Sequence, residues 1–153
     1  MAGAIHRSLM QLKRWHVALV LFAAGALMAL GFAPFYHWPV IFIALPLFYI
    51  LLTASTSRGQ AIWRGFYFGY GYSMAGTWWI GNALLVDAAK FGWMLPFSIL
   101  GLSAAMAAWF MVFGFVVYAS RARMTPLMFA VLWVIVELLR SVGMFGFPWN
   151  LVG

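Results

Sequence analysis

The chain has 153 residues, of which 67% are hydrophobic and only 7% are charged. A soluble monomer of this composition would expose large apolar patches, so the composition excludes a soluble globular domain and predicts an integral membrane protein. Cysteine is absent, which excludes disulfides and thiolate chemistry within these residues. The net charge of +7 does not indicate nucleic-acid binding, because the nine basic residues are scattered between apolar blocks.

Five apolar runs follow one another along the chain, each with about the length of a membrane-spanning helix. They cover about residues 15–32, 36–54, 62–85, 93–118 and 125–139. Unpaired backbone groups at an open strand edge cost several kcal/mol each in lipid, so all five runs are expected to be helices. The predicted fold is all-α: a single transmembrane domain over residues 1–153, built as a polytopic bundle of about five helices.

The first run has an alternative interpretation as a secretory signal, because Gly31-Phe32-Ala33 is a small-residue site of the right kind. Pro34 directly after this site, and a second run a few residues further on, favour an uncleaved first span. Pro39 lies near the start of the second run, where its missing N–H is harmless.

The distribution of Lys and Arg predicts the orientation. One side of the predicted bundle receives seven basic residues and the other receives only Lys90 and Arg140. The richer side is expected to be cytoplasmic, which places the N-terminus inside. The seven are Arg7, Lys13, Arg14, Arg58, Arg64, Arg121 and Arg123. The turn at residues 33–38, the loop at 87–92 and the segment 137–153 then all lie on the outer face.

The third run carries a small residue at every fourth position, which places them in one row along a helix. The row consists of Gly65, Gly69, Ser73, Thr77 and Gly81. Small residues let lipid-embedded helices approach closely, so this row predicts helix packing; a wall beside a lipid or substrate groove is the alternative. In the fourth run, Gly101 with Ala105 and Ala104 with Ala108 offer similar faces.

Tryptophan is abundant near the predicted span ends, a distribution typical of an interfacial aromatic belt. Such positions are Trp15, Trp38, Trp78, Trp79, Trp93 and Trp149. Trp149 differs from the others because it lies in the turn sequence Gly146-Phe147-Pro148-Trp149-Asn150 rather than at a helix end.

The chain has only two acidic residues, and each has a basic residue three positions later, which allows pairing on one helical face. For Asp87 and Lys90, in a polar loop, we expect simple charge neutralisation. Glu137 and Arg140 lie at the end of an apolar run, where ionisable residues face the protein interior or water and are functional candidates. A structural role in positioning the following turn is the equally weighted alternative.

Other chemistries have little support. His6, His16 and His37 fall on opposite sides of the predicted bundle, so no metal site is expected. His37, Asp87 and Ser141 share the outer face, but no nucleophile motif supports a triad. Gly69-Tyr70-Gly71 lacks the Lys and Ser/Thr of a phosphate-binding loop, and no cofactor is expected.

Three segments resemble the N-terminal membrane region of apolipoprotein N-acyltransferases of the bacterial inner membrane. They are FAPFYHWP at residues 32–39, Trp78-Trp79 with Asn82, and LWVIVELLRSVGMFGFPWNLVG at residues 132–153. The most specific part is the series Trp133, Glu137, Arg140 and Gly146-Phe147-Pro148-Trp149. The resemblance covers essentially the whole chain.

The resemblance implies transfer of an acyl chain from a phospholipid to the amino group of the diacylglyceryl-cysteine at a lipoprotein N-terminus. In the family, a Glu, Lys and Cys set on a nitrilase-like periplasmic domain performs this reaction through a thioester. No catalytic residue is therefore expected in these 153 residues, which we expect to be a C-terminally truncated piece that is inactive alone. The expected partners are a phospholipid acyl donor, a lipidated apolipoprotein N-terminus and the membrane.

The resemblance implies a role in substrate access for the segment near the end of the chain. The candidate residues are Glu137, Arg140, Phe147, Pro148, Trp149 and Asn150. The rival hypothesis is a complete small multi-pass protein that acts as a membrane scaffold or transport subunit. A transporter should show repeated halves or a central charge in a span, and neither feature is evident.

Overall fold

The computed structural model describes residues 13–33 and 35–142, and all regular structure in these ranges is helical. The all-α prediction is thereby confirmed for this part of the chain. The longer helices are α2 (Arg14–Ala29), α3 (Ile41–Thr53), α4 (Arg58–Thr77), α7 (Leu95–Ala119) and α8 (Pro126–Val142). Short helices α5 (Asn82–Leu85) and α6 (Ala88–Phe91) and 3-10 turns at Trp38–Val40, Trp78–Gly81, Gly92–Met94 and Arg121–Arg123 connect them.

Each of the five apolar runs overlaps one longer helix, and the bounds differ most at the start of the second run and at the end of the third. The second helix starts late, because Tyr36 has a positive φ of 53°, a left-handed conformation that interrupts helical backbone. The α-helix of the third run ends at Thr77, where the Oγ1 hydroxyl donates to Ser73 O at 2.7 Å and the backbone passes into a 3-10 turn. The predicted polar loop at 87–92 contains α6.

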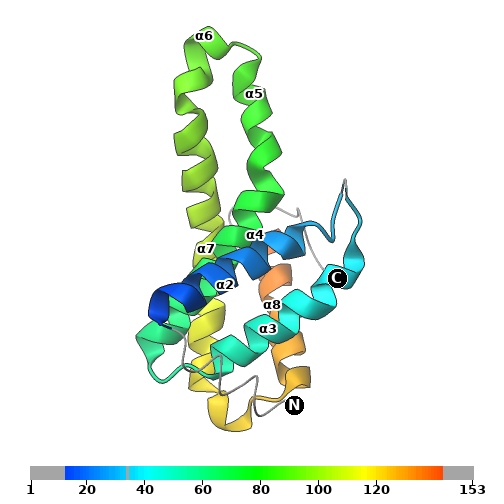
Figure 1. Ribbon diagram of the computed structural model, residues 1–153, viewed down its shortest axis with the longest axis vertical. Coiled ribbons are helices and arrows are strands. Elements are labelled where there is room, and N and C mark those ends of the chain that lie inside the picture. The colour runs from blue at the N-terminus through cyan, green and yellow to red at the C-terminus, as the bar shows by residue number, and fades with distance from the viewer. Residues whose placement is uncertain (1–12, 34, 143–153) are drawn as a thin grey trace.

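Helix α4 lies at the centre of the molecule, between α2 and α7 (Figure 1). Its first turn is capped by Ser57, whose side chain accepts a hydrogen bond from Gln60 N at 3.2 Å. Gln60 Oε1 in turn accepts from Thr56 N at 2.7 Å, so one orphan N–H of the helix start and one of the preceding residue are both satisfied. This capping fixes where the central helix begins.

Glycines allow α4 and α7 to approach at backbone distance. A Cβ at Gly65 would lie 2.0 Å from the carbonyl oxygen of Phe110, and one at Gly69 would lie 2.4 Å from the Phe110 ring. Gly114 on α7 faces Ala61 O in the same way, at 2.4 Å. No residue larger than glycine fits at these positions without separating the helices.

A second pair of glycines joins α4 to α2 on a different face. A Cβ at Gly71 would lie 2.0 Å from Phe22 O, and a Cβ at Gly25 would lie 2.0 Å from Phe68 O. The contact is therefore reciprocal, with one glycine on each helix opposite a carbonyl of the other. Helix α4 is packed against a neighbour by glycine on both of these faces.

Aromatic side chains fill the space between α3, α4, α7 and α8. Phe48 stacks on Phe68 with ring centroids 4.0 Å apart and an interplanar angle of 7°. Trp133 packs within 6.5 Å of both rings and also contacts Phe110, at 5.5 Å, and Phe113, at 5.8 Å. Edge-to-face and offset geometries of this kind add about 0.5–1.5 kcal/mol per pair beyond simple burial.

The hairpin formed by α5, α6 and the first turns of α7 extends beyond the other helices (Figure 1). Its apolar side chains are exposed, for example Val86 at 89%, Trp93 at 69% and Phe97 at 70%. Within the described ranges, one helical stretch, Ala88–Ala119, is both long and apolar enough to cross a membrane, and its 32 residues exceed the roughly 20 that a span needs.

The other helices do not meet that criterion, and crossing by all five stays a prediction. Helices α2 and α3 are apolar but short. Helix α4 is long enough, at 20 residues, to cross a membrane. It contains Arg58, Gln60 and Arg64 and is rich in glycine, and these residues lower its mean hydropathy.

Candidate functional site

Helix α8 directs one face into the bundle, and this face carries both of its charged residues. Phe129, Trp133, Glu137 and Arg140 are spaced by four, four and three residues, which aligns them along one side of a helix. All four are buried: Glu137 is 6% exposed and Arg140 is 5% exposed. The carboxylate and the guanidinium therefore lie inside the protein, as expected for ionisable residues at the end of an apolar helix.

Tyr72 on α4 meets these two residues. Its side chain is 1% exposed, and its hydroxyl oxygen accepts a hydrogen bond from the Arg140 guanidinium and interacts electrostatically with both Glu137 and Arg140. The two helices are thus linked through a polar cluster, defined here as Tyr72, Glu137 and Arg140. Buried charges require such compensation, because an unpaired one costs several kcal/mol.

The indole of Trp133 lies one helical turn from Glu137 on the same face and carries an unused donor. Its Nε1 is fully buried and makes no hydrogen bond to any atom of the described residues. Its ring also packs 6.5 Å from the ring of Tyr72. A buried N–H without an acceptor is uncommon in proteins, so the indole is set apart from the other aromatic side chains of this face.

An apolar pocket of about 170 Å³ opens where α2 and α4 end. Its walls are small and aromatic: Ala29, Leu30, Ala33, Phe35, Ala75, Gly76, Trp78 and Trp79. The pocket is lined by residues from two of the segments that carry the family resemblance, residues 32–39 and the pair Trp78-Trp79. The lining has no charged side chain, so the pocket suits a hydrocarbon group rather than an ion.

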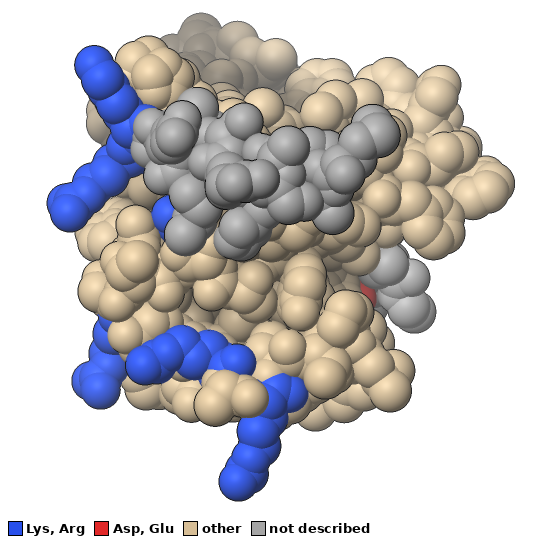
Figure 2. Space-filling model, turned by 60° about the horizontal axis from the view of Figure 1, so that its bottom comes forward, with Lys and Arg blue, Asp and Glu red and all other residues tan. Residues whose placement is uncertain are grey.

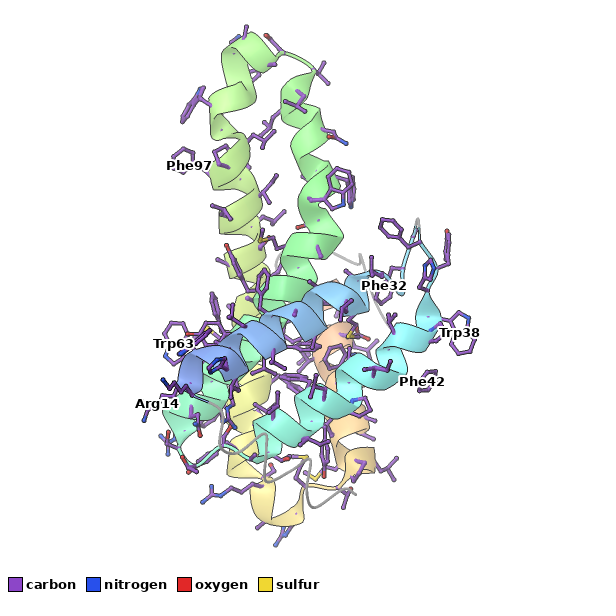
Figure 3. All side chains as sticks on the ribbon, viewed as in Figure 1. Arg14, Phe32, Trp38, Phe42, Trp63 and Phe97 are labelled. Carbon is purple, nitrogen blue, oxygen red and sulfur yellow. The ribbon has the colours of Figure 1, made fainter. Side chains whose placement is uncertain are left out.

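Further aromatic side chains lie near the pocket, where the chain passes from α2 to α3. The ring of Phe32 lies 5.9 Å from that of Tyr72, while Trp38 and Phe42 form an exposed edge-to-face pair with centroids 5.9 Å apart. Figure 3 shows Phe32, Trp38 and Phe42 together where the chain passes from α2 to α3. One aromatic pair therefore joins the end of α2 to the buried tyrosine, and a second, exposed pair lies at the start of α3.

The structure brings together some of the residues predicted from the sequence and separates others. Glu137 and Arg140 share the polar cluster, whereas Asp87 and Lys90 are exposed on the hairpin. The row of small residues is buried along α4 and its 3-10 extension: Gly65, Gly69, Ser73, Thr77 and Gly81. Phe147, Pro148, Trp149 and Asn150 lie outside the described residues.

Sequence reasoning missed Tyr72 and the reciprocal packing of Gly25 against Phe68 O and of Gly71 against Phe22 O. An aromatic residue inside an apolar run is typical of ordinary core packing, so nothing singled out Tyr72. Tyr72 follows Gly69 by three residues and Gly71 by one. Glycines on a lipid-embedded helix indicate close packing, and this spacing was the available sign that Tyr72 contacts a neighbouring helix.

Comparison with known proteins gives one consistent result. Residues 24–153 match the family model described as the apolipoprotein N-acyltransferase N-terminal domain. Similar curated proteins named apolipoprotein N-acyltransferase come from Allorhizobium ampelinum (38% identical; 95% of this chain, 30% of the relative), Rhodopseudomonas palustris (41%; 91% and 27%) and Caulobacter vibrioides (36%; 92% and 27%). The chain thus spans under a third of the length of these relatives.

Proposed function

We propose that this chain forms part of the membrane portion of an apolipoprotein N-acyltransferase. The chain belongs to the apolipoprotein N-acyltransferase N-terminal domain family. The reaction would move an acyl chain from a phospholipid to the N-terminal diacylglyceryl-cysteine of a lipoprotein. The observation that carries the proposal is the family match over residues 24–153. It favours this function over that of a membrane scaffold or transport subunit.

The proposed location is the bacterial inner membrane, with several helices crossing it and the N-terminus in the cytoplasm. The apolar stretch Ala88–Ala119 and the 67% hydrophobic composition support membrane insertion. The excess of Lys and Arg at the start of α2, in the first turns of α4 and in the turn after α7 supports the orientation. The polar cluster and the apolar pocket then lie toward the periplasmic side.

The proposed task of this part of the enzyme is substrate access. The apolar pocket between Ala29 and Trp79 is suited to hold part of an acyl chain, and the exposed aromatics around Trp38 offer an entry surface at the membrane interface. Glu137 and Arg140 would brace the segment that follows α8, in which Pro148 would fix a turn and Phe147, Trp149 and Asn150 would meet the substrate.

The chemistry itself would come from elsewhere. A thioester requires a cysteine, and the chain has none. The family resemblance implies a nitrilase-like domain that supplies Glu, Lys and Cys. We therefore expect no acyl transfer by these 153 residues alone.

A chimera tests the access role. Residues 1–153 replace the corresponding N-terminal region of the Rhodopseudomonas palustris relative, and lipoprotein N-acylation is followed by mass spectrometry of a purified lipoprotein substrate. Trp149→Ala in the chimera should lower the acylation rate about ten- to a hundredfold, because the proposed apolar contact of the indole with the substrate would contribute roughly 1.5–3 kcal/mol. The helical content and thermal stability should be unchanged.

Trp93→Ala is the matched control, since Trp93 is an exposed tryptophan outside the Gly146-Phe147-Pro148-Trp149 series. It should leave the rate within about twofold, as expected for an exposed side chain. An unchanged rate in Trp149→Ala, or an equal loss in both variants, would show that Trp149 has no special part in access.

A further inference from the structure

A second, larger pocket lies at the opposite end of the molecule from the hairpin, between the starts of α2 and α4. Its volume is about 580 Å³, and its lining includes Arg14, Trp15, Ser57, Gln60, Trp63 and Arg64. Figure 3 shows Arg14 and Trp63 beside each other at the start of α2. Two arginines, three hydroxyl or amide side chains and two tryptophans therefore surround one cavity.

No acidic residue neutralises this end of the molecule. The chain contains only two, and Asp87 lies on the hairpin while Glu137 lies within the bundle. Lys and Arg side chains gather on the face turned forward in Figure 2. Because neither acidic side chain lies at this pocket, the positive charge of Arg14 and Arg64 is open to an anion from outside the chain.

Arg64 is positioned by neutral groups. Its Nη1 donates to the carbonyl oxygen of Leu51 and to Ser55 Oγ, the latter at 3.3 Å. These two bonds hold the guanidinium half-buried at the pocket wall, and Nη2 and Nε carry further donors in the fixed geometry that suits a phosphate. Thr56 and Ser57 add hydroxyl groups at the same wall.

The aromatic part of the lining identifies the source of the anion. Trp15 is 57% exposed and Trp63 is 52% exposed, and Tyr67, Val17 and Ala18 continue the pocket along the two helices. Tryptophans at this level are typical of the headgroup region of a bilayer, where an apolar ring meets a polar layer. A ligand that carries both a phosphate and hydrocarbon chains fits such a lining better than a soluble anion does.

We propose that this pocket binds the headgroup phosphate of an anionic phospholipid from the cytoplasmic leaflet. Arg14 and Arg64 contact the phosphate, and Trp15 and Trp63 flank the glycerol and the first part of the acyl chains. The site is separate from the periplasmic pocket and does not depend on acyl transfer. It ties α2 to α4 at the cytoplasmic surface through a lipid.

Native mass spectrometry of the chain in neutral detergent tests the proposal. Phosphatidylglycerol, phosphatidylcholine or inorganic phosphate is added at matched concentrations. Phosphatidylglycerol should bind saturably, with one molecule retained, and phosphatidylcholine should bind about tenfold more weakly because it lacks the net negative charge. Arg14→Gln and Arg64→Gln should each lower phosphatidylglycerol affinity about tenfold, as expected for loss of a charge-assisted hydrogen bond.

The matched control removes two charges elsewhere on the same face. Arg121→Gln combined with Arg123→Gln should leave the affinity within about twofold, because these exposed residues do not line the pocket. Arg14 is exposed and makes no such structural bonds to α3, so its variant remains informative if Arg64→Gln fails to fold. Absence of saturable binding, an equal loss in the control, or displacement by inorganic phosphate at equal concentration would overturn the proposal.

Discussion

Replacing Gly65 by alanine should destabilise the helical bundle by about 3 kcal/mol, near the upper end of overpacking costs. The added Cβ would lie 2.0 Å from Phe110 O and 2.9 Å from Phe110 C, both backbone atoms that cannot move without displacing α7. In an isolated helix the same change is favourable by roughly 1 kcal/mol, so the sign of the effect reports the interhelical contact alone. Thermal unfolding of the purified chain in detergent, followed by circular dichroism, measures it.

Gly101→Ala is the matched control, because Gly101 lies in α7 and no atom lies within 4 Å of its built Cβ. This variant should be as stable as the parent chain or more stable by up to about 1 kcal/mol. Equal stability of the two variants would refute the close approach of α4 and α7 at Gly65.

Substitution of Glu137 by leucine should produce the second large effect, a loss of roughly 3–5 kcal/mol in stability. The change leaves the guanidinium of Arg140 buried with its charge uncompensated, since both side chains are nearly inaccessible to solvent. The double variant Glu137→Leu with Arg140→Met should recover most of this stability, because both charges are then removed from the interior. Unfolding in detergent gives the stability of each variant.

Asp87→Leu is the natural control, since Asp87 is the other acidic residue of the chain and is exposed on the hairpin. Its effect on stability should stay within about 0.5 kcal/mol. If Glu137→Leu and Asp87→Leu are equally mild, Glu137 has no structural role in the bundle.

Activity of the double variant separates a structural role from a role in access. In the chimera, Glu137→Leu with Arg140→Met should fold but acylate about tenfold more slowly, because the polar brace proposed for the segment after α8 is removed. Full acylation by the double variant would show that the pair serves stability only.

Helical periodicity made the row from Gly65 to Gly81 readable from the sequence, because a repeat of four residues defines one face whatever the helix packs against. Gly25 gave no such signal. It belongs to no comparable row of five small residues at four-residue spacing, and its importance follows only from the register that places it opposite Phe68 O. Register between helices depends on the full three-dimensional arrangement.

For the charged residues, too, the sequence shows which ones are unusual but not how the helices bring them together. The sequence identified Glu137 and Arg140 because charge inside an apolar run is costly and needs a reason. From the sequence, Arg64 was expected only as one of seven basic residues on the cytoplasmic side. Its position in a pocket results from the way α2 crosses α4. Tyr72 is one of six tyrosines, and only the packing of α8 against α4 brings it to Arg140.

We propose above that these residues serve as the membrane portion of an apolipoprotein N-acyltransferase. The most direct test is mass spectrometry of a lipoprotein from bacterial cells in which the chimera is the only N-acyltransferase. The lipoprotein should carry three acyl chains, one of them on the N-terminal amine. A lipoprotein that stays diacylated, although the chimera is present in the membrane at the level of the intact relative, would contradict the claim.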